Sequence, residues 1–304
     1  MGLRLDEPLN CFAVLGSCAD AQLYAGGEFI WTMPGEQQIG RLARWDGQEW
    51  NGIPGFPNAP VRSLCAFDDG SGEALFVGGE FRDIGSERFN FIAKWDGVSW
   101  QHLGNGLSIT GFYVSANAMK VYDDGRGPAL YVGGVFTRAG DVDAYGIARW
   151  DGQAWESLDL GTSGPVYALE VYDDGDGPAL YAAGTFTYAG GVLANHIAKW
   201  DGLQWSAVGV GVTPSGVVNA MKRATIAGRN ELYVGGIFEQ AGETPARNLA
   251  RWDGSIWSGV GEGIDLPIDS YIYSADPGVY ALESYDAGNG EELYIGGIFD
   301  ASGD

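Results

Sequence analysis

Acidic turns are the first feature of the sequence that could bind an ion. Four of them carry Asp at the first position and Gly at the third and fifth: Asp68–Gly72, Asp123–Gly127, Asp173–Gly177 and Asp286–Gly290. Calcium takes roughly six to eight oxygen ligands, whereas Asp and Gly in this order are also what a tight hairpin turn requires. We interpret the turns as structural, and any calcium site would use Asp68, Asp123, Asp173, Asp174 and Asp176. No metal or other cofactor is expected.

A second recurring group is a cation beside an aromatic ring. The residue before Trp in a repeated Trp-Asp-Gly motif is basic in every copy: Arg44, Lys94, Arg149, Lys199 and Arg251. Such cations could form a ligand-binding ring. Their presence in every copy favours a scaffold role, either as the partner of a neighbouring carboxylate or stacked on a Trp face.

Catalytic groups are not singled out by any motif. The two histidines, His102 and His196, occupy unrelated places in the repeat, and the chain has no G-x-S-x-G, P-loop or H-E-x-x-H pattern. Forty acidic residues offer many carboxylate pairs for glycoside hydrolysis, but the sequence distinguishes none of them. We therefore favour a protein that is not an enzyme, and leave the question of catalysis open.

These residues lie within an internal repeat. Its first half, of the form LYxGGxF, occurs at Leu23–Phe29, Leu75–Phe81, Leu130–Phe136, Leu180–Phe186, Leu232–Phe238 and Leu293–Phe299. Its second half, of the form IAxWDGxxW, occurs at Leu42–Trp50, Ile92–Trp100, Ile147–Trp155, Ile197–Trp205 and Leu249–Trp257. A period near 50 residues indicates an array of similar units that share one core.

Each unit is predicted to form four short strands and no helix. In the fourth copy we expect them at Val166–Tyr172, Ala179–Phe186, Asn195–Trp200 and Gln204–Val208, because these segments are rich in β-formers and bounded by Gly and Asp. The Asp-Gly of the second half is a strong hairpin signal. The second Gly of LYxGG is invariant and so needs a positive φ or the absence of a Cβ atom, whereas the first, replaced by Ala183, needs only a small side chain.

Four strands in a repeated unit of this length indicate an all-β fold, a β-propeller. The sequences Leu130–Gly134, Trp150-Asp151 and Trp155 resemble the kelch-type repeat, and the chain is also similar to LYxGGxF…IAxWDGxxW repeat proteins of environmental bacteria. We expect one domain over residues 1–304. Its blades are predicted at about 10–55, 56–109, 110–163, 164–214 and 215–264, with a partial blade at 277–304.

The sixth copy contains only the first half of the repeat. We therefore expect five complete four-stranded blades and an incomplete sixth, with the edge of Leu293–Phe299 unpaired. Exposed strand edges invite pairing with other chains, and natural sheets usually cover them. One interpretation is that the 304 residues belong to a longer repeat protein whose next strands complete the ring.

Aromatic residues in the predicted loops are candidates for ligand binding. The connections from strand four to strand one and from strand two to strand three should emerge on one variable face, which carries Trp31, Phe112, Tyr113, Tyr271 and Tyr273. Aromatic side chains on loops held by a rigid scaffold suit the recognition of a protein or a carbohydrate. The alternative is that these loops fold back and bury their own rings.

Charge limits the class of partner. Forty acidic and 17 basic residues give a formal charge of −23, which repels nucleic acid and anionic membranes, and no apolar run is long enough to insert into a bilayer. The three cysteines allow a Cys11–Cys18 bridge across a hairpin or free thiols. We predict a binding module, extracellular or on the cell surface as the resemblance implies. A glycan-processing hydrolase or lyase with carboxylates near a central channel is the alternative.

Overall fold

The computed structural model describes residues 4–16, 20–33, 37–109, 113–213, 216–266 and 277–302. Every regular element in these ranges is a β-strand, so the predicted all-β class is confirmed. The chain divides into two compact units, Met1–Leu158 and Asp159–Asp304. A search of the described residues for a helix able to cross a membrane found none.

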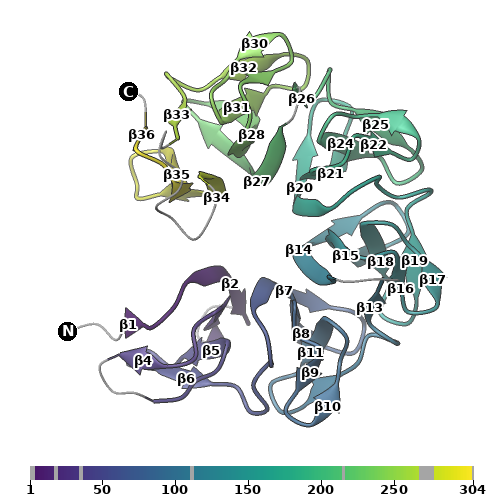
Figure 1. Cartoon of the computed structure of the whole chain (residues 1–304), viewed down its shortest axis with the longest axis vertical. Coiled ribbons are helices and arrows are strands. Elements are labelled where there is room, and N and C mark those ends of the chain that lie inside the picture. The colour runs from purple at the N-terminus through teal and green to yellow at the C-terminus, as the bar shows by residue number, and fades with distance from the viewer. Residues whose placement is uncertain are drawn as a thin grey trace. The chain divides into compact units, whose positions relative to one another are not determined.

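The first unit contains three four-stranded antiparallel sheets, one for each of the first three copies of the repeat (Figure 1). The first comprises β2 (Leu9–Leu15), β3 (Gln22–Gly27), β5 (Leu42–Trp45) and β6 (Trp50–Gly52). The second comprises β7 (Val61–Asp68), β8 (Glu73–Gly79), β11 (Ile92–Trp95) and β12 (Trp100–Gln101). The third comprises β14 (Ser115–Asp123), β15 (Pro128–Val135), β18 (Ile147–Trp150) and β19 (Trp155–Ser157).

The second unit contains the remaining copies. The fourth forms β20 (Val166–Asp173), β21 (Pro178–Gly184), β24 (Ile197–Trp200) and β25 (Trp205–Ala207). The fifth forms β27 (Val217–Ile226), β28 (Arg229–Ile237), β31 (Leu249–Trp252) and β32 (Trp257–Gly259). The sixth forms a two-stranded sheet of β34 (Gly278–Asp286) and β35 (Glu291–Ile298).

Two-residue strands lie in the loops that connect strands two and three and in the segments that precede strand one. In the first unit they are β1 (Arg4–Leu5), β4 (Thr32–Met33), β9 (Asp83–Ile84), β10 (Glu87–Arg88), β13 (Leu107–Ser108), β16 (Arg138–Ala139) and β17 (Val142–Asp143). In the second they are β22 (Tyr188–Ala189), β23 (Val192–Leu193), β26 (Val212–Thr213), β29 (Gln240–Ala241), β30 (Thr244–Pro245), β33 (Ile264–Asp265) and β36 (Ala301–Ser302). The segment before strand one thus pairs with the loop, as β13 does with β16 and β26 with β29.

The four predicted strands of the fourth copy match β20, β21, β24 and β25 to within two residues at each end. The third strand begins at Ile197 rather than Asn195. Asn195 and His196 have φ values of 45° and 77°, which are left-handed and incompatible with an extended strand. The strand prediction relied on the content of β-forming residues, which does not indicate a left-handed turn.

A β-bulge explains the invariant glycine. The first two strands of every copy shift register beside the Gly-Gly pair, as between Val218 and Ala220 in the fifth copy. A Cβ atom on Gly236 would overlap the carbonyl oxygen of Val217, and its φ is not positive. The invariant glycine is therefore needed because backbone approaches backbone too closely for any side chain.

The Trp-Asp-Gly hairpin forms as the sequence predicts. In the third copy Asp151 Oδ1 accepts the backbone N–H groups of Gln153 and Ala154, both at 2.8 Å, and Gly152 has a φ of 99°. The Trp150 and Trp155 rings pack with their centroids 5.2 Å apart. Positive φ suits glycine, so Asp, Gly and the two Trp residues together fix this hairpin.

Neighbouring copies within a unit pack through their first strands. In the first unit β7 lies between β2 and β14, and in the second β27 lies between β20 and β34 (Figure 1). The fourth-strand Trp reaches the preceding copy, since Trp155 Nε1 donates to the Leu103 carbonyl at 2.8 Å. Cys11 and Cys65 are free thiols, and burial raises their pKa values to about 12 and about 11. Cys18 lies outside the described residues.

Candidate functional site

The acidic turns use their first carboxylate to hold the turn itself. Asp68 Oδ1 accepts the backbone N–H groups of Gly70 and Gly72, both at 2.9 Å. Asp123, Asp173 and Asp286 make the same two bonds in their own turns. Within the described ranges, no group of three or more His, Cys, Asp or Glu side chains is arranged to hold a metal ion. The geometry is that of a structural turn.

In the turns that begin Asp-Asp, the second carboxylate lies beside the recurring cation. Lys94 Nζ lies 2.6 Å from Asp69 Oδ1, and Lys199 Nζ lies 2.7 Å from Asp174 Oδ2. Burial raises the pKa of Asp174, but hydrogen bonds from Lys199 and Tyr181 outweigh it, so the net pKa lies below the ordinary value. The carboxylates are thus held in the charged form, and the predicted scaffold role of the cations is confirmed for these pairs.

The same site varies in the other copies. Arg149 Nε lies 3.6 Å from Asp124 Oδ2. Arg251 donates instead to Glu231, at 3.0 Å, and Arg44 to Gln22, at 3.5 Å. The acceptors Glu231 and Gln22 both lie next to the Leu that opens LYxGG rather than in the hairpin turn. The cation is therefore retained while the position of its partner changes.

The predicted aromatic residues fall into two groups. Phe112, Tyr271 and Tyr273 lie outside the described residues. Trp31 is 41% exposed and its backbone N–H donates to Asp6 Oδ1 at 2.9 Å, while Tyr113 is 50% exposed. Of the two, Tyr113 lines a pocket and Trp31 does not belong to it.

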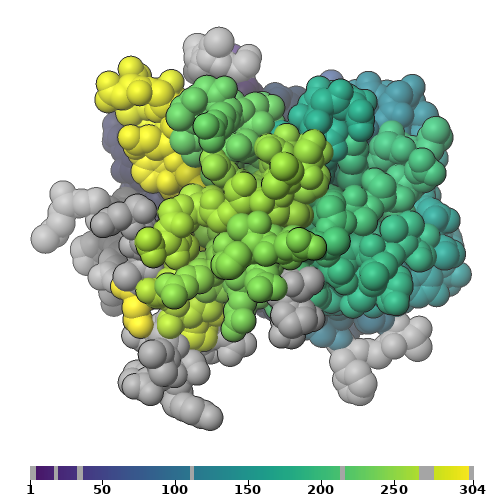
Figure 2. All heavy atoms as spheres, turned by 90° about the horizontal axis from the view of Figure 1, so that it is seen from above, coloured from purple at the N-terminus to yellow at the C-terminus, as the bar shows by residue number. Residues whose placement is uncertain are grey.

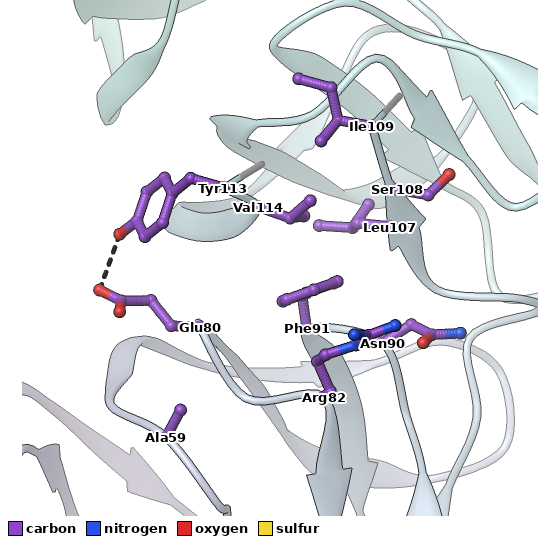
Figure 3. A pocket seen from close by; sticks show the side chains of 10 residues that line it. All are labelled: Ala59, Glu80, Arg82, Asn90, Phe91, Leu107, Ser108, Ile109, Tyr113 and Val114. Atoms are coloured by element: carbon purple, nitrogen blue, oxygen red, sulfur yellow. Dashed lines mark hydrogen bonds between the residues drawn. The ribbon is translucent and has the colours of Figure 1, made fainter. Parts of the chain in front are cut away.

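The pocket that contains Tyr113 is a hollow of about 390 Å³ in the first unit. Its lining combines apolar and polar side chains: Ala59, Glu80, Arg82, Asn90, Phe91, Leu107, Ser108, Ile109, Tyr113 and Val114 (Figure 3). The residues come from the second copy and from the segment that leads into the third. A volume in this range suits a small ligand, and a few polar groups around an apolar floor can fix its orientation.

One carboxylate of the pocket is held by two neighbours. The Tyr113 hydroxyl donates to Glu80 Oε1 at 2.7 Å, as Figure 3 shows, and Arg62 forms an ion pair with the same oxygen at 2.7 Å. Arg62 also pairs with Glu28 at 2.9 Å. Burial and the bond to Glu80 raise the Tyr113 pKa to about 12. Tyr113 therefore stays a neutral donor, and Glu80 Oε2, which bonds to none of the described residues, can accept a bond from a ligand.

A β-bulge directs the Arg62 side chain toward Glu80. Arg62 is the extra residue between Val61 and Ser63, where the register of β7 and β8 shifts. Bulges redirect the side chains that they carry. Asn10 and Asn219, at the same place in copies one and five, donate instead to the Val61 and Val279 carbonyl groups of the next copy. In copy two the bulge residue is therefore a charged Arg62, which pairs with Glu80 of the pocket.

Two residues of the pocket have left-handed backbone conformations. Asn90 and Phe91 have φ values of 55° and 75°. Phe91 is secured by its N–H bond to the Phe81 carbonyl at 2.8 Å, and Asn90 by its side-chain bond to the Asn105 carbonyl at 3.0 Å. Asn195 and His196 share this conformation in copy four. This left-handed pair therefore belongs to the repeat, and in copy two it brings Phe91 into the pocket lining.

Arg82 is the charged side chain of the pocket that is best placed to contact a ligand, since the other, Glu80, is already paired with Arg62. Its side chain is exposed and makes no ion pair with any other described residue. Its backbone is fixed, because Asn58 Oδ1 accepts the Arg82 N–H at 3.0 Å and the Arg82 carbonyl accepts the N–H of Phe89 at 2.8 Å. A guanidinium presents several donors in a planar fork, so Arg82 can bind an anionic or hydroxyl-rich ligand.

Of these pocket residues, the sequence analysis named Tyr113 as a candidate for ligand binding and did not name Glu80, Arg82, Asn90 or Phe91. Comparison of one copy with another could have found two of them. Glu precedes the Phe of GGxF only in the first two copies, and a basic residue follows that Phe only at Arg82. Phe91 carries no such signal, because its role depends on the left-handed turn.

Comparisons with known proteins bear on the fold. No family model and no curated protein matches the sequence. Among solved structures, the chain is similar to the extracellular domain of a candidate one component system from B. thetaiotaomicron, with a TM-score of 0.56 and 13% sequence identity. The match covers 96% of this chain and 31% of that one, so this chain spans about a third of its length. At this identity the likeness is one of fold.

Proposed function

We propose that the protein is a binding module that presents the Tyr113 pocket to a carbohydrate or a protein. The observation that carries the proposal is the pocket itself, a hollow of about 390 Å³ with an exposed phenol, an unpaired guanidinium and a carboxylate oxygen around an apolar floor. Such a mixture provides both donors and acceptors beside a surface for stacking. A sugar ring, with hydroxyl groups at its edge and C–H groups on its face, is complementary to it.

The proposal includes the architecture on which the pocket is built. We infer a kelch-like β-propeller with five complete four-stranded blades and an incomplete sixth, of which each unit contributes three copies. The repeated LYxGGxF and IAxWDGxxW halves and the shared bulge support this inference. In such a ring the pocket would lie on the variable face, where loops carry recognition.

An extracellular or cell-surface location is part of the same proposal. The structural relative is an extracellular domain. The formal charge of −23 disfavours a nucleic acid or an anionic membrane as the partner. We therefore expect the ligand to be a neutral or polar carbohydrate, or a protein surface.

The arrangement of carboxylates favours binding over catalysis. A glycosidase uses one carboxylic acid that holds a proton and a second carboxylate across the scissile bond. Glu80 is the carboxylate among the described residues that line the pocket. Arg62 forms one ion pair with Glu80 and another with Glu28. Glu80 Oε1 is already bound by the Arg62 guanidinium and the Tyr113 hydroxyl, and the described lining of the pocket holds no second carboxylate that could act across a scissile bond.

A carbohydrate array followed by calorimetric titration tests this function. Wild-type protein should bind at least one glycan, and Arg82→Ala should weaken binding by about tenfold, since hydrogen bonds to charged groups are among the stronger ones. Arg138→Ala is the matched control, because Arg138 is an exposed loop arginine of the third copy that pairs with Asp143. Equal affinity of Arg82→Ala and wild type would contradict the site. Release of reducing sugar would favour the enzyme.

A further inference from the structure

The Tyr113 pocket keeps two opposite charges apart. Glu80 and Arg82 both line it, and the structure shows no ion pair between these two described residues. Figure 3 shows Tyr113 and Glu80 on one side of the pocket and Arg82 with Asn90 on the other. An ionised carboxylate only accepts hydrogen bonds, whereas a guanidinium only donates them. A ligand that spans the pocket therefore needs a donor at one end and an acceptor at the other.

The surface between these two ends is apolar. Leu107 is 1% exposed and Val114 is 8% exposed, and in Figure 3 both lie with Phe91 between the two polar ends. A hydroxyl group placed against such a surface loses its water without gaining a hydrogen-bond partner, which costs free energy. A methyl group gains free energy from the same burial. The floor therefore favours an apolar substituent of the ligand over a hydroxyl group.

The other copies do not repeat this combination. Glu before the Phe of GGxF together with a basic residue after that Phe occurs in copy two alone. In the fifth copy, drawn in green at the front of Figure 2, Arg247 takes the place of Asn90 and forms an ion pair with Asp265 at 3.3 Å. A free guanidinium beside an apolar floor is thus a feature of copy two and not a requirement of the repeat.

We propose that the ligand of the Tyr113 pocket is an N-acetylated amino sugar, an inference that rests on the proposed function and specifies its carbohydrate. An acetamido group combines a carbonyl oxygen that only accepts, an N–H donor and an apolar methyl group. The carbonyl oxygen accepts a bond from Arg82, and the methyl group covers the floor at Leu107 and Val114. Glu80 Oε2 accepts a bond from the N–H or from a ring hydroxyl group. The acetamido group is neutral, which suits a pocket whose own two charges have opposite signs.

The test compares sugars that differ only in one substituent. Oligosaccharides of N-acetylglucosamine, glucosamine and glucose, matched in length and linkage, are titrated calorimetrically into the whole 304-residue protein. N-acetylgalactosamine and galactose repeat the comparison on the epimeric ring. In at least one series the N-acetylated sugar should bind about tenfold more tightly than its hydroxyl counterpart, because it adds a bond to a charged group and buries a methyl group. Glucosamine should bind more weakly than N-acetylglucosamine, although the formal charge of −23 attracts a cation.

Variants of the protein connect this preference to the pocket. Arg82→Ala should weaken binding of the N-acetylated sugar about tenfold and reduce its advantage over the hydroxyl sugar. Val114→Thr keeps the size of the side chain but places a hydroxyl group in the floor, so it should also reduce that advantage. Arg138→Ala, outside the pocket lining, should change neither.

The outcomes distinguish this inference from the function on which it rests. Hydroxyl sugars that bind as tightly as the N-acetylated ones, and that Arg82→Ala still weakens, would overturn the inference and retain the pocket as a carbohydrate site. Absence of binding by every sugar tested and by every glycan of the array would overturn the proposed function and the inference together.

Discussion

The fourth and sixth copies each place an acidic side chain against the Tyr of strand two, Asp174 from the hairpin turn and Glu292 from the strand itself, but in different surroundings. Asp174, whose side chain is 10% exposed, accepts bonds from Tyr181 and Lys199 at 2.7 Å. Among the described residues, Glu292 accepts a bond from the Tyr294 hydroxyl, and both residues are exposed. Both acids accept a bond from the Tyr hydroxyl, and the pair is buried where a third strand covers strand two and exposed where none of the described residues does so.

The difference follows from the cost of burying charge. A buried carboxylate must be paired, because its desolvation costs several kcal/mol. An exposed one keeps its water and contributes little on its own. Where β24 covers β21, Lys199 is therefore required, whereas Glu292 remains exposed without such a partner.

Loss of the buried carboxylate is expected to have the largest effect. Asp174→Asn leaves the Lys199 charge, 14% exposed, without its close partner and should lower the free energy of unfolding by about 3 kcal/mol. Glu292→Gln, the matched control in the same unit, should leave it unchanged within error. Denaturant titration measures both, and equal losses would contradict the comparison.

The glycines of the bulge give a second contrast. Gly236→Ala should destabilise by about 2 kcal/mol, since the new Cβ atom would overlap the Val217 carbonyl oxygen and force the backbone to move. In Gly296→Ala the new Cβ atom would meet Ala281, with Cβ at 3.4 Å and the carbonyl oxygen at 4.0 Å, so the substitution should have little effect. Thermal unfolding of the two variants checks this prediction. A Gly236→Ala protein as stable as wild type would show that the bulge tolerates a side chain.

Acid should weaken the complete copies in which a carboxylate is paired with the recurring cation. The pKa values of Asp69, Asp124 and Asp174 lie below the ordinary 3.8 in the folded protein, so their contribution is present above that pH and lost as pH falls through the folded values. Stability should therefore decline below about pH 4. Asp174→Asn should flatten this decline and Glu292→Gln should not, as melting curves from pH 6 to pH 2.5 would reveal.

Removal of calcium should have the smallest effect. The first carboxylates of the acidic turns already accept two backbone N–H bonds each, as Asp173 does from Gly175 and Gly177. A chelator should leave the melting temperature unchanged, and added calcium should not raise it. A large fall on chelation, reversed by calcium, would assign Asp68, Asp123, Asp173, Asp174 and Asp176 to a calcium site instead.

Much of the fold could be predicted from sequence because it depends on local chemistry repeated several times. Asp-Gly between two Trp-bearing segments fixes a hairpin, and an invariant glycine marks a close approach of backbone. The alternatives for that glycine were a positive φ or the absence of Cβ, and the structure favours the second at Gly236. The third strand of copy four was predicted two residues too early, because a left-handed pair leaves no signature in β-propensity.

The sequence by itself determined the repeat, the strand class, the hairpins and the recurrence of a cation beside Trp, since each depends on residues close along the chain. Only the tertiary structure decided which carboxylate that cation meets and which aromatic side chain lines a pocket. Lys94 and Asp69 are 25 residues apart, and Tyr113 and Glu80 are 33 apart. Contacts at such separations depend on strand pairing and on the bulge that aims Arg62, which no local pattern encodes.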